Sequence, residues 1–224
     1  MNRLSKNVRL RFSVGEPGRF ISHLDVLRLM SRAVRRAGLP IAYSQGFSPT
    51  PRLAFASSLP VGVTSAAEYV DLQLNTPVEW EQVKNRLNDV LPDGFRILAG
   101  AALPEKYPPL MSLITTARYQ IKVLGEAPDL EKKTADLTAS GQILASVKRK
   151  NKEEQVDVRG LIDSLAYDPL QRLIELQCAS GVQANLRPMD LLPLLGLELR
   201  DVLIHRTDLL IKAGAGRLLT PFDV

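Results

Sequence analysis

The chain has 224 residues, of which 45% are hydrophobic and 24% are charged, so it is long enough for one large domain or two small ones. Its one cysteine, Cys178, excludes an internal disulfide framework and any metal or cluster site that needs several cysteines, and it indicates a reducing compartment. No uncharged apolar run approaches the ~20 residues of a membrane span, and the polar start MNRLSKNVRLRF lacks the apolar core of a signal peptide. We therefore expect a cytoplasmic protein with no membrane partner.

Positive charge is concentrated in the first quarter of the chain. Residues 1–56 contain ten Lys and Arg residues and two acidic ones, so this quarter carries a net charge of +8, whereas the whole chain carries +5. A basic end on a nearly balanced protein indicates contact with a polyanion, an acidic partner or anionic substrate groups. A solvated helix face has the same composition, and the charge count does not distinguish the two.

The first half of the chain predicts the order strand-helix-strand-strand-helix-strand. Residues 7–14 alternate between apolar and polar side chains, which predicts a half-buried strand. A helix begins at the N-cap Ser22, with Asp25 completing a near capping box, and it ends at Gly38. The residues expected on its core face are Leu24, Leu27, Met30, Val34 and Ala37. The other predicted elements are strands at 52–57, 68–74 and 95–98 and a helix at 78–90.

The second half repeats this order with an insertion, after a proline-rich link at 103–113. We predict strands at 119–124, 161–165, 170–177 and 199–205, helices at 129–138 and 187–195, and a hairpin whose tip is the basic turn Lys148–Lys152. The predicted fold is therefore α+β, with two tandem ferredoxin-like (βαββαβ) units that have antiparallel sheets. The predicted domains are 1–104 and 113–212, followed by a loosely held tail at 213–224.

The basic helix contains the first candidate site. Arg28, Arg32, Arg35 and Arg36 fall together on one face, because residues four apart are neighbours on a helix. His23 lies in the first turn, where free backbone N–H groups and the helix dipole favour a neutral imidazole that can act as a general acid or base. His23 is thus a candidate catalytic residue. Alternatively, Ser22 and Asp25 cap the helix while His23 packs on the loop.

The loop that follows is the second candidate site. Its glycine, hydroxyl groups and arginine suit an anion, and its two aromatic rings suit stacking on a base. The residues that we expect to bind RNA or another anion are the helix residues Arg28, Arg32, Arg35 and Arg36 together with Tyr43, Ser44, Gln45, Gly46, Phe47 and Arg52. Alternatively, the segment is an ordinary loop that connects two elements, although such a loop needs only some of these residues. We expect the arginines and the loop to share one outward-facing pocket. No His, Asp and Glu cluster has the spacing of metal ligands.

The segment RFISHLDVLRLMSRAVRRAGLPIAYSQGFSPTPRLAFASSLPVGVTSAAEYVDL, residues 19–72, resembles the N-terminal signature of the bacterial radical-SAM-linked protein family, whose function is unknown. The resemblance implies partnership with a cobalamin-binding radical S-adenosylmethionine protein, encoded beside this chain or fused to it. The chain lacks the three-cysteine cluster motif of such enzymes, so we expect it to bind no cofactor itself. Thr50 stands where the family often has histidine, which weakens the case for catalysis by the loop.

A fainter similarity is to the CRISPR-repeat-processing endoribonucleases, which look like paired ferredoxin-like domains with a histidine near the first helix. Three functions therefore stay open. The first is a non-catalytic accessory or substrate-recognition protein that works with a radical S-adenosylmethionine enzyme and binds RNA. The second is a metal-independent endoribonuclease that uses His23. The third is a purely protein-binding module.

Overall fold

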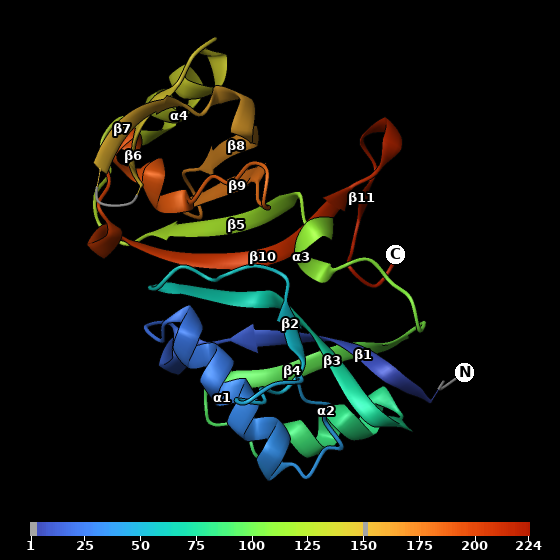
Figure 1. The fold of residues 1–224 in the computed structure, drawn as a ribbon. Coiled ribbons are helices and arrows are strands. Elements are labelled where there is room, and N and C mark those ends of the chain that lie inside the picture. Colours follow the sequence, from blue (N-terminus) through green and yellow to red (C-terminus); the bar gives the residue numbers. More distant parts are fainter. Residues whose placement is uncertain (1–3, 150–151) are drawn as a thin grey trace. The chain divides into compact units, whose positions relative to one another are not determined.

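The computed structural model describes residues 4–149 and 152–224. The chain divides into two compact units, which Figure 1 shows as ribbons. Unit 1 consists of Met1–Ile114 together with Leu210–Val224, and unit 2 of Thr115–Leu209. The fold is mixed α+β with mostly antiparallel sheets, as the sequence predicts at this level.

Unit 1 has the element order predicted for the first half of the chain. Its elements are β1 (Ser5–Val14), α1 (His23–Arg36), β2 (Leu53–Phe55), β3 (Val63–Val78), α2 (Trp80–Asn88), β4 (Phe95–Leu103), α3 (Leu110–Leu113) and β11 (Leu218–Leu219). Strand β1 lies between β4 and β3, and β2 pairs with β3. Helices α1 and α2 cover one face of this sheet (Figure 1), and the main core of the unit lies between these two layers.

The core face of α1 differs from the predicted stripe. Val26, Met30, Ala33 and Val34 are the buried residues of this helix, whereas Leu24 is 62% exposed. Met30 and Val34 are confirmed as core residues, and Leu27 and Ala37 are partly buried and pack against the core. The prediction is therefore wrong at Leu24 and omits Val26 and Ala33, because α1 has apolar side chains on more than one face.

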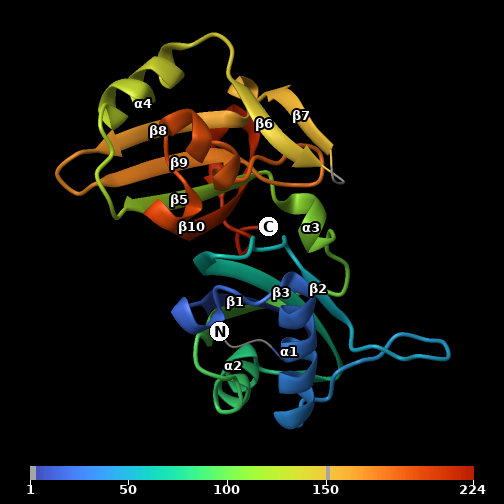
Figure 2. The same ribbon diagram turned by 90° about the vertical axis from the view of Figure 1, so that its left-hand side faces the viewer.

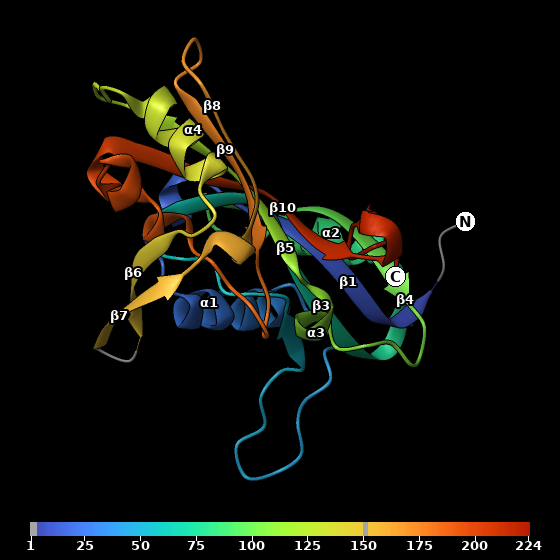
Figure 3. The same ribbon diagram turned by 90° about the horizontal axis from the view of Figure 1, so that it is seen from above.

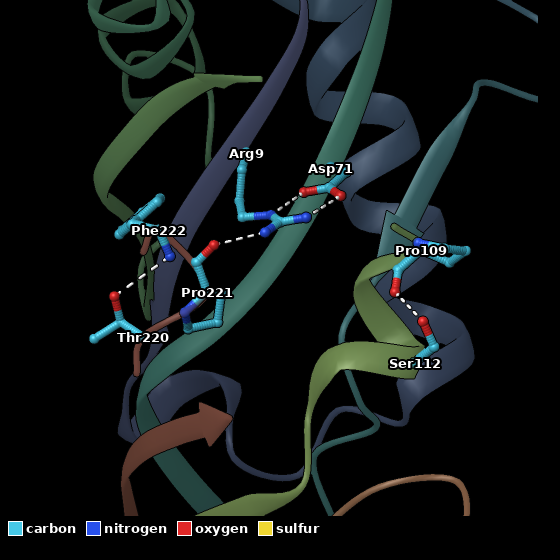
Figure 4. Close-up of polar contacts among 7 residues, drawn as sticks. All are labelled: Arg9, Asp71, Pro109, Ser112, Thr220, Pro221 and Phe222. Atoms are coloured by element: carbon cyan, nitrogen blue, oxygen red, sulfur yellow. Dashed lines mark hydrogen bonds and ion pairs between the residues drawn. The ribbon is translucent and has the colours of Figure 1, made fainter. Parts of the chain in front are cut away.

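The polar face of β1 is also covered, so the prediction of a half-buried strand is wrong at Arg9. The Arg9 guanidinium is 1% exposed, and its Nε and Nη2 donate to the two carboxylate oxygens of Asp71 at 2.8 and 2.9 Å (Figure 4). Its Nη1 donates to the carbonyl oxygen of Pro221 at 2.6 Å. Burial raises the pKa of the Asp71 carboxyl, and the adjacent Arg9 guanidinium opposes that rise.

The C-terminal residues belong to unit 1 and are not a loosely held tail, which corrects the predicted domain boundaries. Strand β11 pairs with the end of β10 (Val202–Lys212), and the ring of Phe222 packs edge-on against Tyr69 with centroids 5.4 Å apart. Pro221 is buried. The tail is therefore part of the surface that covers Arg9.

Unit 2 carries the insertion that the sequence predicts. Besides most of β10, its elements are β5 (Thr116–Val123), α4 (Leu130–Ala139), β6 (Leu144–Arg149), β7 (Lys152–Asp157), β8 (Ile162–Asp168) and β9 (Leu173–Ala179). The sheet order is β10-β5-β9-β8, and β6 and β7 form a separate hairpin (Figure 2). The tip of the predicted basic turn, Lys150 and Asn151, lies outside the described residues.

The helix predicted at 187–195 is instead two 3-10 helices, Pro188–Asp190 and Leu192–Leu195. Pro193 has no backbone N–H to continue a single helix across this segment. Cys178 is fully buried, and burial raises the pKa of its thiol to about 12.

Candidate functional site

The start of α1 is fixed by hydrogen bonds among neighbouring polar residues. The Asp25 backbone N–H donates to Ser22 Oγ at 3.2 Å, and Ser22 Oγ donates to Asp25 Oδ2 at 2.7 Å. Arg28 Nη1 donates to Asp25 Oδ1 at 2.9 Å. The Ser22 hydrogen bond, followed by Arg28, lowers the pKa of Asp25, so this carboxylate is ionised at neutral pH. The predicted N-cap is confirmed.

Three of the four predicted helix arginines line one open groove. Arg28, Arg32 and Arg36 stand on its α1 side, and Val90 and Pro92, which follow α2, are on the other. The groove has a volume of about 470 Å³, and its floor includes apolar side chains of α1. The three arginines are one helical turn apart, about 6 Å at 1.5 Å per residue. The sequence therefore predicted a shared face, and the structure makes this face one wall of a groove.

Two of these arginines have side chains that form no hydrogen bond or ion pair among the described residues. They are Arg32 and Arg36, and both are exposed, although the charge of Arg32 also helps to lower the pKa of Asp25. Arg86 of α2 binds the carbonyl groups that directly follow the helix. Its Nε donates to Ala37 O at 2.9 Å and its Nη2 donates to Gly38 O at 2.5 Å. Because Arg86 binds these carbonyl groups, they do not need a hydrogen bond from Arg32 or Arg36, whose side chains remain available to a ligand.

Arg35 does not line the groove. Its Nε donates back to the Ser31 carbonyl oxygen at 3.2 Å, and its side chain is exposed on another side of the helix. The four arginines predicted to act together are therefore divided into three groove residues and one outside residue.

The predicted loop is a projecting hairpin, which Figure 3 shows leaving the body of unit 1 between α1 and β2. Its stem is closed by the pairing of Tyr43 with Pro51 and by hydrogen bonds between Ser44 and Thr50, including Ser44 N–H to Thr50 O at 2.9 Å. Gly46 has φ +122°, a backbone conformation that favours glycine, as its place in the loop predicts. The remaining predicted loop residues are Gln45, which is exposed, Phe47, which is fully exposed, and Arg52, whose Nη1 donates to Gln73 Oε1 at 2.9 Å.

The groove and the loop do not share one pocket, so that prediction is wrong. No loop residue lines the groove. Before the loop begins, Ile41 pairs with Leu74 of β3 and the Ala42 N–H donates to the Gln73 carbonyl oxygen at 2.8 Å. The chain thus crosses to the β3 edge of the sheet, and the loop projects from there and not from beside the arginines.

His23 faces the core and does not line the arginine groove. Its ring packs edge-on against Phe55 with centroids 5.8 Å apart, and it lines a narrow cavity with Phe12 and Glu68. Glu68 is buried and accepts a hydrogen bond from Ser65 Oγ at 2.7 Å. The histidine therefore packs on a core aromatic ring, not on the projecting loop.

The family of this chain follows from a comparison over most of its length. The model of one bacterial family matches residues 7–188. The chain belongs to this family, which is described as "Uncharacterized protein conserved in bacteria (DUF2344)". No curated protein matches the chain. Among solved structures, a chain in "Crystal Structure of a Cbf5-Nop10-Gar1 Complex" is similar at 12% identity with a TM-score of 0.43, covering 92% of this chain and 49% of that one. The present chain thus spans about half the length of that solved chain.

The family match covers the basic helix, the groove and the projecting loop. In the part of the chain that the structure describes, no three His, Cys, Asp or Glu side chains are grouped so that they could hold a metal ion. Within the same residues, no helix is long and apolar enough to cross a membrane.

Two features of this surface are not predicted from the sequence. Val90 and Pro92 form the far wall of the groove but lie more than fifty residues from the arginines in sequence, so no local pattern connects them. Phe20, which is 67% exposed, directly precedes the groove residue Ile21. The sequence feature that could have indicated an exposed Phe20 is its position two residues before the N-cap Ser22, outside the predicted core face of the helix.

Proposed function

We propose that this protein is a non-catalytic, RNA-binding accessory protein that recognises substrate for a cobalamin-binding radical S-adenosylmethionine enzyme. The observation that carries the RNA part is the groove lined by Arg28, Arg32 and Arg36, two of which have no partner among the described residues. Guanidinium groups bind phosphate oxygens in a planar, bidentate geometry, and a row of them along an open groove suits a polyanion better than a single small anion.

The other part of the proposal rests on the resemblance of residues 19–72 to radical-SAM-linked proteins. An accessory protein of this kind positions the substrate, while the partner holds the cobalamin and the iron–sulfur centre and carries out the reaction. This chain then needs a binding surface and no cofactor of its own. We also infer that the two units are tandem ferredoxin-like folds, supported by the corresponding strand orders, β4-β1-β3-β2 in unit 1 and β10-β5-β9-β8 in unit 2.

The test uses two neighbouring arginines that differ in their position relative to the groove. Arg36→Glu places a negative charge in the groove, whereas Arg35→Glu makes the same charge change one residue away and outside it. RNA affinity is measured at several salt concentrations by fluorescence anisotropy. We expect wild-type affinity to fall as salt rises, because bound phosphates release counterions. Arg36→Glu should weaken binding more than tenfold and reduce the salt slope by about one, and Arg35→Glu should have a much smaller effect.

RNA binding that is independent of salt, or equally affected by both substitutions, would contradict a role for the groove. As a control, circular dichroism should show that both variants keep the helix content of wild type, because both side chains are exposed.

A second candidate, a purely protein-binding module, is favoured by Phe47. A fully exposed aromatic ring at the tip of a projecting hairpin suits insertion into a pocket of a partner protein. A pull-down of native partners after nuclease treatment separates this candidate from the first. Partners that are retained by wild type and lost with Phe47→Ala would favour protein binding through the loop.

The endoribonuclease alternative has less support, because catalysis at a phosphate needs His23 near the groups that bind it. His23 instead packs on Phe55 and lies outside the groove. An RNA-cleavage assay in EDTA that compares wild type with His23→Ala tests this directly, and cleavage that is lost in the variant would restore the alternative.

A further inference from the structure

Phe20 is exposed to solvent and directly precedes Ile21, which lines one end of the groove. The Arg19 guanidinium carbon lies 4.5 Å from the centroid of the Phe20 ring, and Arg19 Nη1 donates to Glu16 Oε2 at 2.7 Å. The backbone is fixed too, because the Gly62 N–H donates to the Arg19 carbonyl oxygen at 2.7 Å. A cation therefore stabilises the ring, which is nevertheless 67% exposed.

The groove has chemically different ends. At the Phe20 end, Ile21 and the ionised Asp25 line it, and Asp25 repels phosphate although its charge is partly balanced by Arg28. At the other end, the side chains of Arg32 and Arg36 form no hydrogen bond or ion pair among the described residues. Phosphate is therefore favoured at the arginine end, and an uncharged group is favoured near Phe20.

This polarity fits a short piece of a polynucleotide strand. Asp25 and Arg32 are seven residues apart on α1, about 10 Å at 1.5 Å per residue, a length that a dinucleotide spans. A nucleobase is uncharged, has two flat apolar faces, and carries amino or imino donors on its edge that suit a carboxylate. Leu24, also exposed, lies one helical turn before Arg28 and adds apolar surface to the start of α1.

We propose that the groove binds an unpaired RNA strand, with phosphates on Arg32 and Arg36 and one base stacked on Phe20. This inference rests on the proposed RNA-binding function of the groove and specifies its substrate class. A base inside a duplex is already stacked on its neighbours and cannot lie on a side-chain ring, so the geometry selects single strands, loops or ends.

The experiment compares two exposed phenylalanines that differ in position. Phe20→Ala, Phe20→Trp, Phe47→Ala and the double variant Arg32→Glu/Arg36→Glu are titrated against a fluorescent single-stranded RNA and against a blunt duplex of the same sequence. We expect wild type to prefer the single strand. Phe20→Ala should weaken binding to the single strand by about 5-fold to 150-fold, the range for loss of one stacked base. Phe20→Trp, which keeps a flat aromatic ring, should keep the affinity within about twofold of wild type, and Phe47→Ala tests the alternative that the base stacks on the loop.

The outcomes separate this inference from the proposed function. If the double arginine variant loses RNA binding while Phe20→Ala does not, or if the duplex binds as tightly as the single strand, the stacked base is wrong and the RNA groove stands. If Phe47→Ala weakens binding and Phe20→Ala does not, the base stacks on the loop and the inference is again overturned. If the double arginine variant binds like wild type, the proposed function fails, and this inference fails with it.

Discussion

The buried ion pair of unit 1 makes a quantitative prediction about stability. Arg9 and Asp71 are 1% and 2% exposed, and they are joined by two parallel hydrogen bonds of 2.8 and 2.9 Å (Figure 4). Asp71→Asn keeps the shape of the side chain but removes its charge, which leaves the buried guanidinium without a counter-ion. Removing one partner of a buried pair costs about 3–5 kcal/mol. We expect a loss of this size in the free energy of unfolding of unit 1.

The assay is equilibrium unfolding in urea, followed by the fluorescence of Trp80. This is the one tryptophan in the sequence, and it lies in α2 of unit 1. With an m-value of about 2 kcal/mol per molar urea, the midpoint should fall by about 2 M. Replacing both partners, Arg9→Met with Asp71→Leu, should recover most of the loss, because a well-packed apolar pair needs no counter-ion.

A loss below about 1 kcal/mol for Asp71→Asn, the size seen for exposed ion pairs, would refute this reasoning. It would mean that water reaches the guanidinium despite the burial of both side chains. Recovery in the double variant is the internal control, because a defect caused by poor packing at residue 71 would become worse when both residues are changed.

Three further predictions concern the C-terminal segment of unit 1 and the start of α1. Deletion of residues 213–224 removes the Pro221 carbonyl from Arg9 and the Phe222 ring from Tyr69, so unit 1 should unfold at lower urea concentration by the same Trp80 assay. Ser22→Ala removes the N-cap of α1 and should lower stability by about 1 kcal/mol, whereas Ser31→Ala, within the helix, should have little effect. Because Ser22 and Arg28 lower the pKa of Asp25, its contribution to stability is present above the ordinary value of 3.8 and is lost as pH falls through the lower folded-state pKa. Urea midpoints measured as pH decreases should show a smaller Asp25-dependent loss in Ser22→Ala, and an unchanged loss would contradict this assignment.

Local signals predicted the elements of unit 1 well, because strand alternation and helix caps depend on neighbouring residues. The cap formed by Ser22 and Asp25 is an example, since both partners lie within one turn. Alternation failed at Arg9, because the C-terminal tail that covers this residue lies more than two hundred positions away. The same limit applies to the groove. Its arginines on α1 were predicted, but its other wall was not, because that wall comes from the distant segment after α2.

The separation of groove and loop also depends on pairing between distant residues. From sequence, Arg36 and Tyr43 are seven residues apart, which suggests one surface. The bridge between Ile41 and Leu74 decides otherwise, because it anchors the connecting segment to β3 before the hairpin begins. A chain that turned back toward α2 after Gly38 would have brought the same residues together.

The structure divides the basic quarter of the chain into charges with partners and charges available to a ligand. Arg9 is buried in an ion pair, Arg19 is bound by Glu16, and Arg11 donates from Nε to the Ala66 carbonyl oxygen at 2.7 Å. These arginines stabilise the fold and cannot bind phosphate without losing those contacts. Fewer arginines are therefore available for the proposed RNA binding than the net charge of the region indicates, and those available include Arg32 and Arg36. This division explains why substitutions in the groove should change the salt dependence of binding and leave stability unchanged, whereas substitution of Arg9 should do the reverse.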